Sequence, residues 1–565
     1  MRQCRWFLLG AILTFLPLRA FAPESPQAAT QASACDLLIG PGGDDLAVRR
    51  NICLLVAGGE LPIMRWPDFI RWRSHARQFY DAAAYSAAWI EDGELTPQAR
   101  VMIEIFQHAD EKGLRPLDYD GARWNQRLEK FNGVTLPPDD QAGFDVALTV
   151  SALRYISDLR QGRANPAAQY GLSGKGFDPA DFLRNQIIHS GDVRSALAQV
   201  EPSYAIYRRT LTALKFYTSL LKQGEDESLP TPTVKPLAPG QTYSGAAALA
   251  EKLRRLGDLA EDAPLPPQTD LYDGALVEAV KNFQHRHGLA PDGLIGAETF
   301  RELATPIAFR VRQLQLALER IRWLPAGLQP PLIVVNVPEF QLRAYEDHRV
   351  LTMKVIVGKA FDRQTPVFAD ELEYVIFRPY WNVPAKIVKE EIIPLLVKRP
   401  DYLAKHQMEV VDRQGNVITA GTVHRDTMQE LRAGRLELRQ RPGPKNSLGL
   451  VKLVFPNQYD VYLHGTPERE LFSRTRRDFS HGCIRVEDAA ALAAWALSHD
   501  PSWTRERIRS AMLGEETLQV NLPRHIPVMI VYGTAVVEDN GEVRFFNDVY
   551  GLDDALARAL VAGHP

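Results

Sequence analysis

The stretch 446–497, NSLGLVKLVFPNQYDVYLHGTPERELFSRTRRDFSHGCIRVEDAAALAAWAL, decides the fold class of the second half of the chain. Its runs 451–454 and 461–463 are apolar and rich in Val and Leu, and Gly, Pro, Asn and Asp surround them. Short apolar runs bounded by turn-forming residues are typical of strands. The Ala-rich run 489–497 predicts a helix. Together these elements indicate a mostly β domain.

The same strand pattern continues on both sides of this stretch. Upstream, four more strands are predicted over 332–337, 341–345, 351–357 and 374–377. Residues 386–440 interrupt them with charged, helical sequence, so we expect an insertion that caps the β domain. The tail predicts two strands and a helix over 527–531, 543–545 and 553–561. We therefore expect one domain over 330–535, followed by a C-terminal strand and helix over 536–565.

The first half of the chain is predicted to be helical. Between residues 60 and 222 apolar residues recur at helical spacing, for example Phe79, Tyr80 and Ala83. Residues 223–243 are rich in Pro and poor in bulky apolar residues, which indicates a linker.

A small separate unit is predicted over residues 244–305. Val277, Val280 and Phe283 form an apolar stripe along a helix that ends at Gly288. An Asp-Gly turn at 292–293 then leads into a short final helix.

The composition excludes several classes of protein. The chain has 565 residues, of which 45% are hydrophobic and 24% charged, as in ordinary globular proteins of several domains. Lys and Arg number 66 and Asp and Glu 69, a formal net charge of −3, whereas a nucleic-acid binder normally has a basic excess. The sequence contains no internal repeat, dinucleotide-binding glycine motif, Walker loop, CxxC pair or HExxH motif.

The N-terminal segment predicts export from the cytoplasm. Arg2 and Arg5 precede an apolar run over 6–18 that is too short to span a bilayer, which takes about 20 residues. Small residues that suit cleavage end at Ala22 and at Ala34. Residues 1–34 are therefore either a cleaved signal or an uncleaved anchor, and we expect a periplasmic protein that touches the membrane only through that segment.

The four cysteines differ in context. Cys4 lies in the export segment, and Cys35 and Cys53 flank seventeen residues. In an oxidising compartment the latter pair is a disulfide candidate, although spacing alone does not fix the distance between their Cβ atoms. Cys483 is left alone, so it is either a buried inert thiol or a reactive one.

The surroundings of Cys483 favour reactivity. His464 follows a predicted strand, and fifteen residues separate it from Ser480. His481, Gly482 and Cys483 follow Ser480 directly. A free thiol has a pKa of about 8.5, and a nearby imidazole is the usual means of activating it. An acceptor on the other ring nitrogen fixes the tautomer of such an imidazole. The glycine lets a substrate carbonyl approach backbone N–H groups that would hold an oxyanion.

Two alternatives use the same residues. His464, His481 and Cys483 together are a possible ligand set for catalytic zinc, and Cys483 alone is a possible structural core residue. His285 and His287, which belong to the small unit over 244–305, are expected on a helix surface rather than in a metal site.

The spacing H-x15-S-H-G-C, with the flanks quoted above, resembles the signature of L,D-transpeptidases with a YkuD-type catalytic domain. The phrases VKNFQHRHGLAPDGLIGAETF (280–300) and LYDG (271–274) resemble a three-helix peptidoglycan-binding module. Over about 60–560 the chain is similar to the large periplasmic subclass. The resemblance implies a multi-domain α+β protein: an α-helical scaffold domain, the three-helix module, and a mostly-β catalytic domain with an inserted helical capping subdomain.

The resemblance also implies roles for individual residues. Cys483 would be the acyl-accepting nucleophile, His464 the general acid and base, and the Gly465 carbonyl the group that orients His464. Four neighbours would shape the pocket and oxyanion hole or position a carboxylate or loop, namely Ser480, His481, Gly482 and Arg485. The stretch Tyr380, Trp381 and Asn382 would lie beside the cleft, although packing or hinge support for the insertion accounts for it equally well.

The implied activity is peptidoglycan cross-linking in cell wall biogenesis and the maintenance of cell shape. A tetrapeptide stem would be the donor and the diaminopimelate of a second stem the acceptor, giving a 3→3 link through a thioester, with no metal or organic cofactor. Carbapenems would acylate the same thiol. The alternatives are an L,D-carboxypeptidase, an enzyme that attaches a lipoprotein lysine, and a non-catalytic wall-binding scaffold.

Overall fold

The computed structural model describes residue 35 and residues 43–131, 136–164, 177–224, 228–264, 270–361 and 363–562. The chain divides into two compact units: residues 1–103, 123–153 and 180–189 form the first, and residues 104–122, 154–179 and 190–565 the second. The predicted export signal or anchor, 1–34, lies outside the described residues. None of the helices in the described ranges has both the length and the apolar character needed to cross a membrane.

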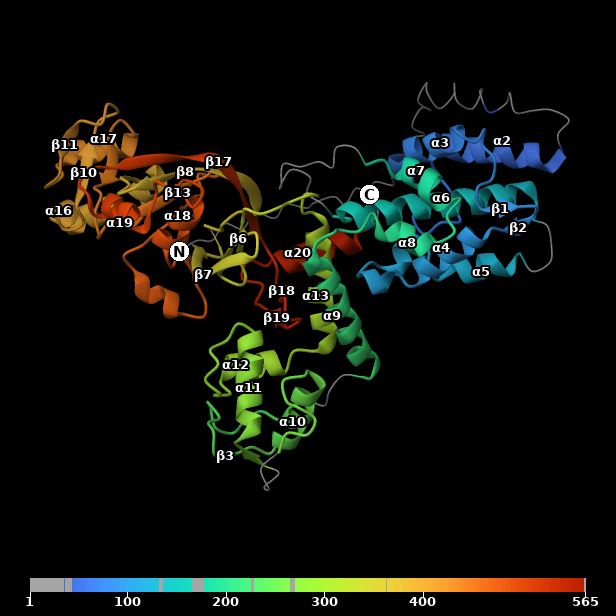
Figure 1. The fold of residues 1–565 in the computed structure, drawn as a ribbon, viewed down its shortest axis with the longest axis horizontal. Coiled ribbons are helices and arrows are strands. Elements are labelled where there is room, and N and C mark those ends of the chain that lie inside the picture. Colours follow the sequence, from blue (N-terminus) through green and yellow to red (C-terminus); the bar gives the residue numbers. More distant parts are fainter. Residues whose placement is uncertain are drawn as a thin grey trace, which may run out of the picture. The chain divides into compact units, whose positions relative to one another are not determined.

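Helices make up most of the described part of the region predicted as a helical scaffold, which also contains the strand pair β1 (Ile90–Glu91) and β2 (Glu94–Leu95) (Figure 1). The helices are α2 (Gly43–Gly58), α3 (Arg73–Asp81), α4 (Pro97–Gln107), α5 (Arg123–Glu129), α6 (Pro138–Gln161), α7 (Pro179–Phe182), α8 (Val193–Ala198) and α9 (Ala205–Lys222). Within the first unit, the buried carboxylate of Asp145 accepts hydrogen bonds from the Tyr80 hydroxyl at 2.7 Å and the Trp89 N–H at 2.8 Å. These bonds compensate its burial. A disulfide joins Cys35 to Cys53 of α2.

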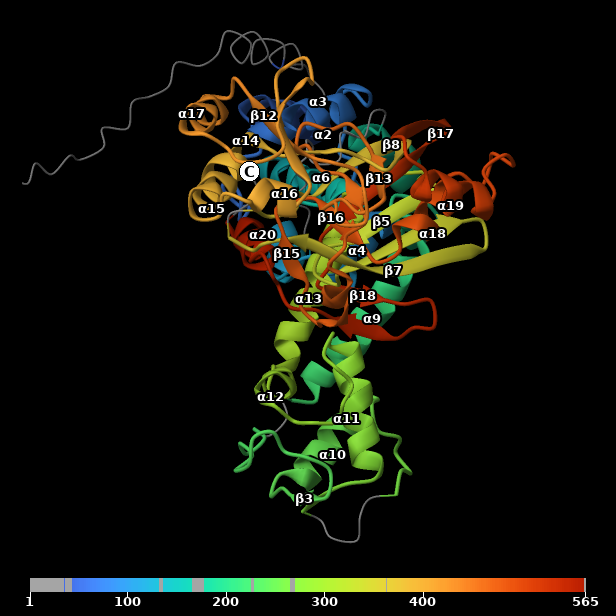
Figure 2. The ribbon, with the colours of Figure 1, turned by 90° about the vertical axis from the view of Figure 1, so that its left-hand side faces the viewer.

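The small unit is a helical module with its own core (Figure 2). It comprises α10 (Ala246–Arg255), α11 (Ala275–Arg286), α12 (Ala297–Leu303) and the strand pair β3 (Gln241–Thr242) and β4 (Leu271–Tyr272). Val277, Val280 and Phe283 are buried in that core, as the predicted stripe requires.

One expectation for this module is wrong. His285 is exposed, but His287, expected on the helix surface, is buried. α11 ends at Arg286, and the turn that follows places the His287 ring 3.8 Å from the Phe283 ring centroid, with Nδ1 2.7 Å from the Phe283 carbonyl. His287 is four residues after Phe283, and its N–H still donates to the Phe283 carbonyl at 3.0 Å, so it extends the buried stripe to which Phe283 belongs.

A nine-stranded sheet forms the centre of the C-terminal region. Its strands are β5 (Leu332–Asn336), β6 (Gln341–Glu346), β7 (Arg349–Gly358), β8 (Phe368–Phe377), β13 (Val451–Val454), β14 (Leu463–His464), β15 (Asp478–Ser480), β16 (Ile484–Val486) and β17 (Leu518–Val531). Their order is β15-β7-β16-β14-β13-β8-β17-β5-β6, and β6 also pairs with β7, so the sheet closes on itself like a barrel. The helices α18 (Ala489–Ala496) and α19 (Arg505–Leu513) contribute side chains to its core.

The insertion forms a lobe with a separate core (Figure 1). Its helices are α14 (Ala385–Ile387), α15 (Ile393–Lys398), α16 (Tyr402–Lys405) and α17 (Arg425–Ala433), and its strands are β9 (Trp381–Asn382), β10 (Met408–Val411), β11 (Val417–Thr419) and β12 (Glu437–Gln440). The strands pair in the order β11-β10-β12-β9. The helical prediction for this lobe is therefore incomplete. Its strands are only two to four residues long, and Glu409 of β10 and Arg439 of β12, which pair at 2.7 Å, interrupt the apolar pattern.

The C-terminal segment returns to the second unit. β18 (Ala535–Val537) and β19 (Val543–Phe545) form a hairpin, and α20 (Leu552–Val561) follows. The hairpin shares a hydrophobic core with α9 and with α13 (Ile307–Arg322).

Candidate active site

Strand register brings the predicted nucleophile and base to one place. β14 and β16 are parallel, and the register pairs Leu463 with Ile484. The N–H of Ile484 donates to the carbonyl of Tyr462 at 3.1 Å, so Cys483 is level with Tyr462, two residues before His464. The side chains of Cys483 and His464 line one cleft of about 1080 Å³.

The imidazole of His464 is held in one tautomer. Its Nδ1 lies 2.6 Å from the carbonyl oxygen of Gly465, which can only accept, so Nδ1 carries the hydrogen and Nε2 is free to take a proton. Burial lowers the pKa of His464 to about 3, and the positive charges of Arg485 and Lys452 act in the same direction. The ring is therefore neutral near pH 7.

The thiol of Cys483 is partly exposed to the cleft. Its Sγ donates to the carbonyl of Asp460 at 3.5 Å. Burial raises the pKa of the Cys483 thiol, although hydrogen bonds from the N–H and hydroxyl of Tyr462 and the charge of Lys452 act in the opposite direction. At rest, therefore, a neutral thiol and a neutral imidazole share the cleft.

Lys452 is a residue of this cleft that sequence reasoning missed. It lies on β13 directly opposite His464, and its Nζ lies 3.7 Å from the ring centroid of Tyr462. Burial lowers the pKa of Lys452, and no carboxylate of the described residues forms an ion pair with it. The sequence pattern could have identified Lys452. Val451 and Leu453 on either side of it are buried in the core, and alternation along the strand places Lys452 on the opposite face of the sheet, toward the cleft.

The loop that carries the nucleophile is fixed by hydrogen bonds. Ser480 Oγ donates to the Cys483 carbonyl at 2.6 Å and accepts from the Gly482 N–H at 3.1 Å. Gly482 has a φ of +120°, which other residues rarely adopt. Thr365 Oγ1 donates to the Gly482 carbonyl at 2.8 Å. Because C=O and N–H point in opposite directions across a trans peptide, this bond directs the Cys483 N–H away from Thr365.

A second brace reaches this loop from the C-terminal segment. Thr365 Oγ1 also accepts from the Gly358 N–H at 2.9 Å. The hydroxyl of Tyr550 donates to the Gly358 carbonyl at 2.7 Å and accepts from the Thr365 N–H at 3.2 Å. Tyr550 thus fixes the end of β7, and through Thr365 it fixes the peptide next to the nucleophile.

His481 joins the catalytic loop to the insertion. Its Nε2 lies 2.7 Å from Oε1 of Glu391, in the helical turn Val388–Ile392, and Nη1 of Arg363 lies 2.5 Å from the same oxygen. Burial raises the pKa of Glu391, but the bonds from His481 and Arg363 outweigh it and hold the value below the usual range. Glu391 is therefore an anionic bridge between the two parts.

The other predicted residues also line the cleft. Arg485 pairs with Glu468 of the loop that follows His464. Tyr380, Trp381 and Asn382 stand where the chain enters the insertion, and the Trp381–Asn382 strand pairs with β12. They therefore both line the cleft and support the insertion. Among the described residues no group of three or more His, Cys, Asp or Glu side chains is placed to hold a metal ion, and His481 is turned toward Glu391.

Comparisons with known proteins agree with this geometry. Residues 330–530 match an L,D-transpeptidase catalytic domain, residues 243–303 a putative peptidoglycan binding domain and residues 74–214 a scaffold domain. A putative L,D-transpeptidase from Haemophilus influenzae is 32% identical over 243 residues, which are 43% of this chain and 48% of the relative. The match thus spans about half the length of that curated relative.

The solved structures include the crystal structure of an L,D-transpeptidase from Xylanimonas cellulosilytica. The two sequences are 16% identical. The match covers 54% of this chain and 100% of the Xylanimonas chain, with a TM-score of 0.15. A score this low carries no argument. The domain matches therefore show that this chain contains an L,D-transpeptidase catalytic domain of the YkuD type, together with a scaffold domain and a domain that matches a peptidoglycan-binding module.

Proposed function

We propose that the protein cross-links peptidoglycan as an L,D-transpeptidase, with Cys483 as nucleophile and His464 as general acid and base. The observation that carries the proposal is the neutral, tautomer-fixed imidazole in the same cleft as the thiol. The domain match supports the reaction class.

The reaction would start from the neutral pair. Sγ of Cys483 attacks the carbonyl of the third residue, diaminopimelate, in a donor tetrapeptide while Nε2 of His464 takes the thiol proton. His464 then protonates the leaving D-alanine amine, which leaves a thioester. The side-chain amine of diaminopimelate on a second stem attacks the thioester and gives its proton to His464. This sequence forms the 3→3 link and regenerates the thiol.

Lys452 supplies the positive charge that the neutral imidazole lacks. As the thiol proton leaves, negative charge develops on sulfur, and a cation in a partly desolvated cleft stabilises it more than in water. Lys452 forms no ion pair with a carboxylate of the described residues, although the more distant charge of Asp460 acts on it. We therefore assign it to stabilisation of the thiolate, acting beside Tyr462.

The oxyanion would be held by the N–H of Cys483. Gly482 is not the donor, because its own N–H is bonded to Ser480. The Cys483 N–H has no acceptor among the described residues, and the bond from Thr365 to the preceding carbonyl aims it away from the sheet end of β7. Preorganised N–H donors of this kind are worth roughly 10²–10³ in rate.

The insertion would cover the bound stem. Its residues line the same cleft, and the bridge from Glu391 to His481 and Arg363 joins it to the catalytic loop. Together with the predicted export segment and the peptidoglycan-binding domain, this arrangement supports a periplasmic enzyme associated with the cell wall.

The experiment is incubation of the full chain with a disaccharide-tetrapeptide, followed by mass spectrometry of the products. Release of D-alanine with a cross-linked dimer is the expected result, and Cys483→Ala should give neither. Release of D-alanine with monomeric tripeptide alone would identify an L,D-carboxypeptidase, because water would then be the acceptor. Unchanged substrate would leave only a wall-binding scaffold.

A further inference from the structure

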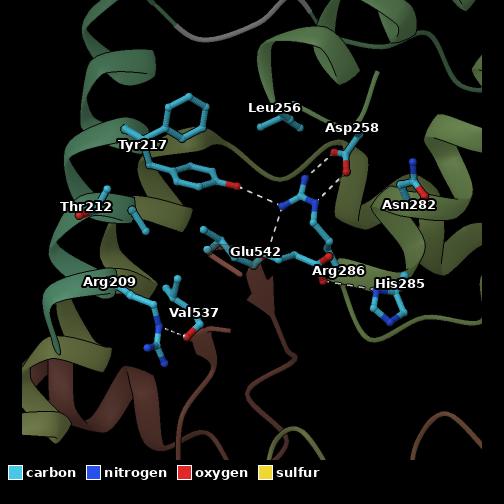
Figure 3. A pocket seen from close by; sticks show the side chains of 15 residues that line it. Arg209, Thr212, Tyr217, Leu256, Asp258, Asn282, His285, Arg286, Val537 and Glu542 are labelled. Carbon is cyan, nitrogen blue, oxygen red and sulfur yellow. Dashed lines mark hydrogen bonds and ion pairs between the residues drawn. The ribbon is translucent and has the colours of Figure 1, made fainter. Parts of the chain in front are cut away.

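Two large cavities lie among the described residues of the second unit, and they differ in what their charged groups contact. One, of about 720 Å³, is bordered by α9, the peptidoglycan-binding module and the β18–β19 hairpin (Figure 3). Arg286 in its wall donates to Asp258 at 2.7 Å and to the Val543 carbonyl at 3.0 Å. Both partners are parts of the wall, so this arginine supports the cavity. The catalytic cleft is the other cavity, and its ion pairs are arranged differently.

In the cleft, one ion pair joins two separate parts of the fold. His481 precedes Cys483 by two residues. Arg363 precedes Thr365, the residue that braces the catalytic loop, by two residues. Nε2 of His481 and Nη1 of Arg363 lie 2.7 and 2.5 Å from the same oxygen of Glu391, which belongs to the insertion. The catalytic domain therefore supplies both positive partners, and the insertion supplies the carboxylate between them.

The two basic side chains are fixed, whereas the carboxylate has room to leave. The Arg363 side chain is only 14% exposed, and hydrogen bonds fix the loop that carries His481. The Glu391 side chain is 36% exposed, and the ends of its turn, Val388–Ile392, are buried in the core of the insertion. Rotation of the glutamate side chain toward water would thus vacate the two basic groups without moving either backbone.

The substrate of the proposed reaction carries the same chemical group as Glu391. A donor stem ends in the carboxylate of D-alanine, one residue from the carbonyl that Cys483 attacks, and diaminopimelate carries another carboxylate on its side chain. Guanidinium and imidazole groups form charge-assisted hydrogen bonds with carboxylates. The contacts of Glu391 are an example of such binding inside the cleft, next to the nucleophile.

We propose that Arg363 and His481 form a subsite for a carboxylate of the donor stem, and that Glu391 fills this subsite until the stem displaces it. The inference rests on the proposed function, since it names the part of the stem that the cleft recognises. Glu391 would compete with the stem and lower its apparent affinity. Displacement would also break the bridge between the insertion and the catalytic loop, so entry of the stem would release the insertion.

Calorimetric titration of the full chain carrying Cys483→Ala tests the proposal, because this variant binds without turnover. The probe is the free tetrapeptide L-alanyl-γ-D-glutamyl-meso-diaminopimelyl-D-alanine. Adding Glu391→Gln should tighten binding by about fivefold, since the competing charge is removed. Adding Arg363→Gln should weaken binding by about tenfold, since a charged donor is lost, and Arg363→Lys should recover part of the affinity.

Glu430→Gln is the matched control for the glutamate. Glu430 also pairs with an arginine of the insertion, Arg435 at 2.6 Å, but it does not line the cleft. Its replacement should leave the affinity for the tetrapeptide unchanged.

Two altered tetrapeptides identify the carboxylate that is bound. One has a C-terminal amide in place of the D-alanine carboxylate, and the other has an amide on the side-chain carboxyl of diaminopimelate. The amide that weakens binding to the Cys483→Ala chain, and makes it insensitive to Arg363→Gln, marks the group that occupies the subsite.

Weaker or unchanged binding in Glu391→Gln would overturn the proposal, because Glu391 would then act only as a brace. Equal binding of all three peptides, or no binding of any, would overturn it as well. Thermal melts would show that each variant is folded. The titration involves no turnover, so a chain that binds the tetrapeptide as expected but releases no D-alanine would refute the proposed function alone. A chain that cross-links stems but shows none of these affinity changes would refute the subsite alone.

Discussion

The catalytic cleft and the cavity at the module differ in how their charges are arranged. In the cavity Arg209 and Arg286 each face a carboxylate, and Arg286 also bonds to the hairpin and to α9. In the cleft, Lys452 forms no ion pair among the described residues, and burial together with the charges of Arg485 and Lys452 keeps His464 neutral. A site that generates an anion gains from a nearby cation, whereas the paired charges at the cavity hold its walls in place.

The largest effect should come from removing the thiol. Cys483→Ala eliminates the atom that forms the thioester, so the rate of dimer formation should fall by at least about 10³-fold. Intact-mass spectrometry after exposure to a carbapenem provides a second readout, since a covalent adduct is expected on the unaltered chain and none on the variant. Retention of full cross-linking by Cys483→Ala would show that the unbalanced charges of the cleft have another purpose.

The next largest effect should come from the base. His464→Gln keeps a polar side chain but removes the proton acceptor, and we expect about 10²-fold slower acylation, within the usual range for general base catalysis. His525→Gln is the matched control, because His525 is an exposed histidine of the same sheet outside the cleft. Equal effects of the two changes would remove His464 from the mechanism.

A smaller effect isolates the charge of Lys452. Loss of a nearby cation disfavours the thiolate, so Lys452→Met should raise the pKa of Cys483 by about one unit and slow its alkylation near neutral pH by about tenfold. The measurement is the rate of iodoacetamide labelling at Cys483 against pH, followed by peptide mass spectrometry. Lys452→Arg keeps the charge and should restore the profile. A profile that is the same in Lys452→Met would contradict the electrostatic role.

The smallest effect should come from the brace behind the nucleophile. Thr365→Val removes the donor to the Gly482 carbonyl and the acceptor of the Gly358 N–H, which should lower kcat several-fold with little change in KM. Unpaired buried groups of this kind cost about 1–3 kcal/mol of folding stability. Thr365→Ser retains the hydroxyl and should restore kcat. Equal losses in both variants, with unchanged melting temperatures, would indicate a packing role instead.

The parts of the site that lie close together in the sequence were predictable. His464, its Gly465 partner and the loop from Ser480 to Cys483 occupy one short stretch, and the spacing alone indicates thiolate chemistry. The strands of the large sheet were predictable for a similar reason, since Val and Leu runs between turn residues mark them individually.

The remaining contacts depend on tertiary packing. His481 meets Glu391 from 90 positions away, and Gly482 meets Thr365 from 117. No local pattern encodes such pairs, because each follows from strand order and from the return of the insertion to the sheet. The strands of the insertion escaped prediction because they are only two to four residues long. The burial of His287 escaped prediction because a histidine was not counted with the apolar stripe to which Phe283 belongs.

The hydrogen bonds of the Tyr550 hydroxyl bear on how far a fragment of the catalytic domain should extend. The homologous segment stops at residue 530, yet the donor that steadies the end of β7 lies 192 positions beyond Gly358. A fragment excised at the limit of homology would keep every residue of the cysteine motif and lose this support. Fragments intended for inhibitor screening should therefore extend beyond the matched range and include Tyr550.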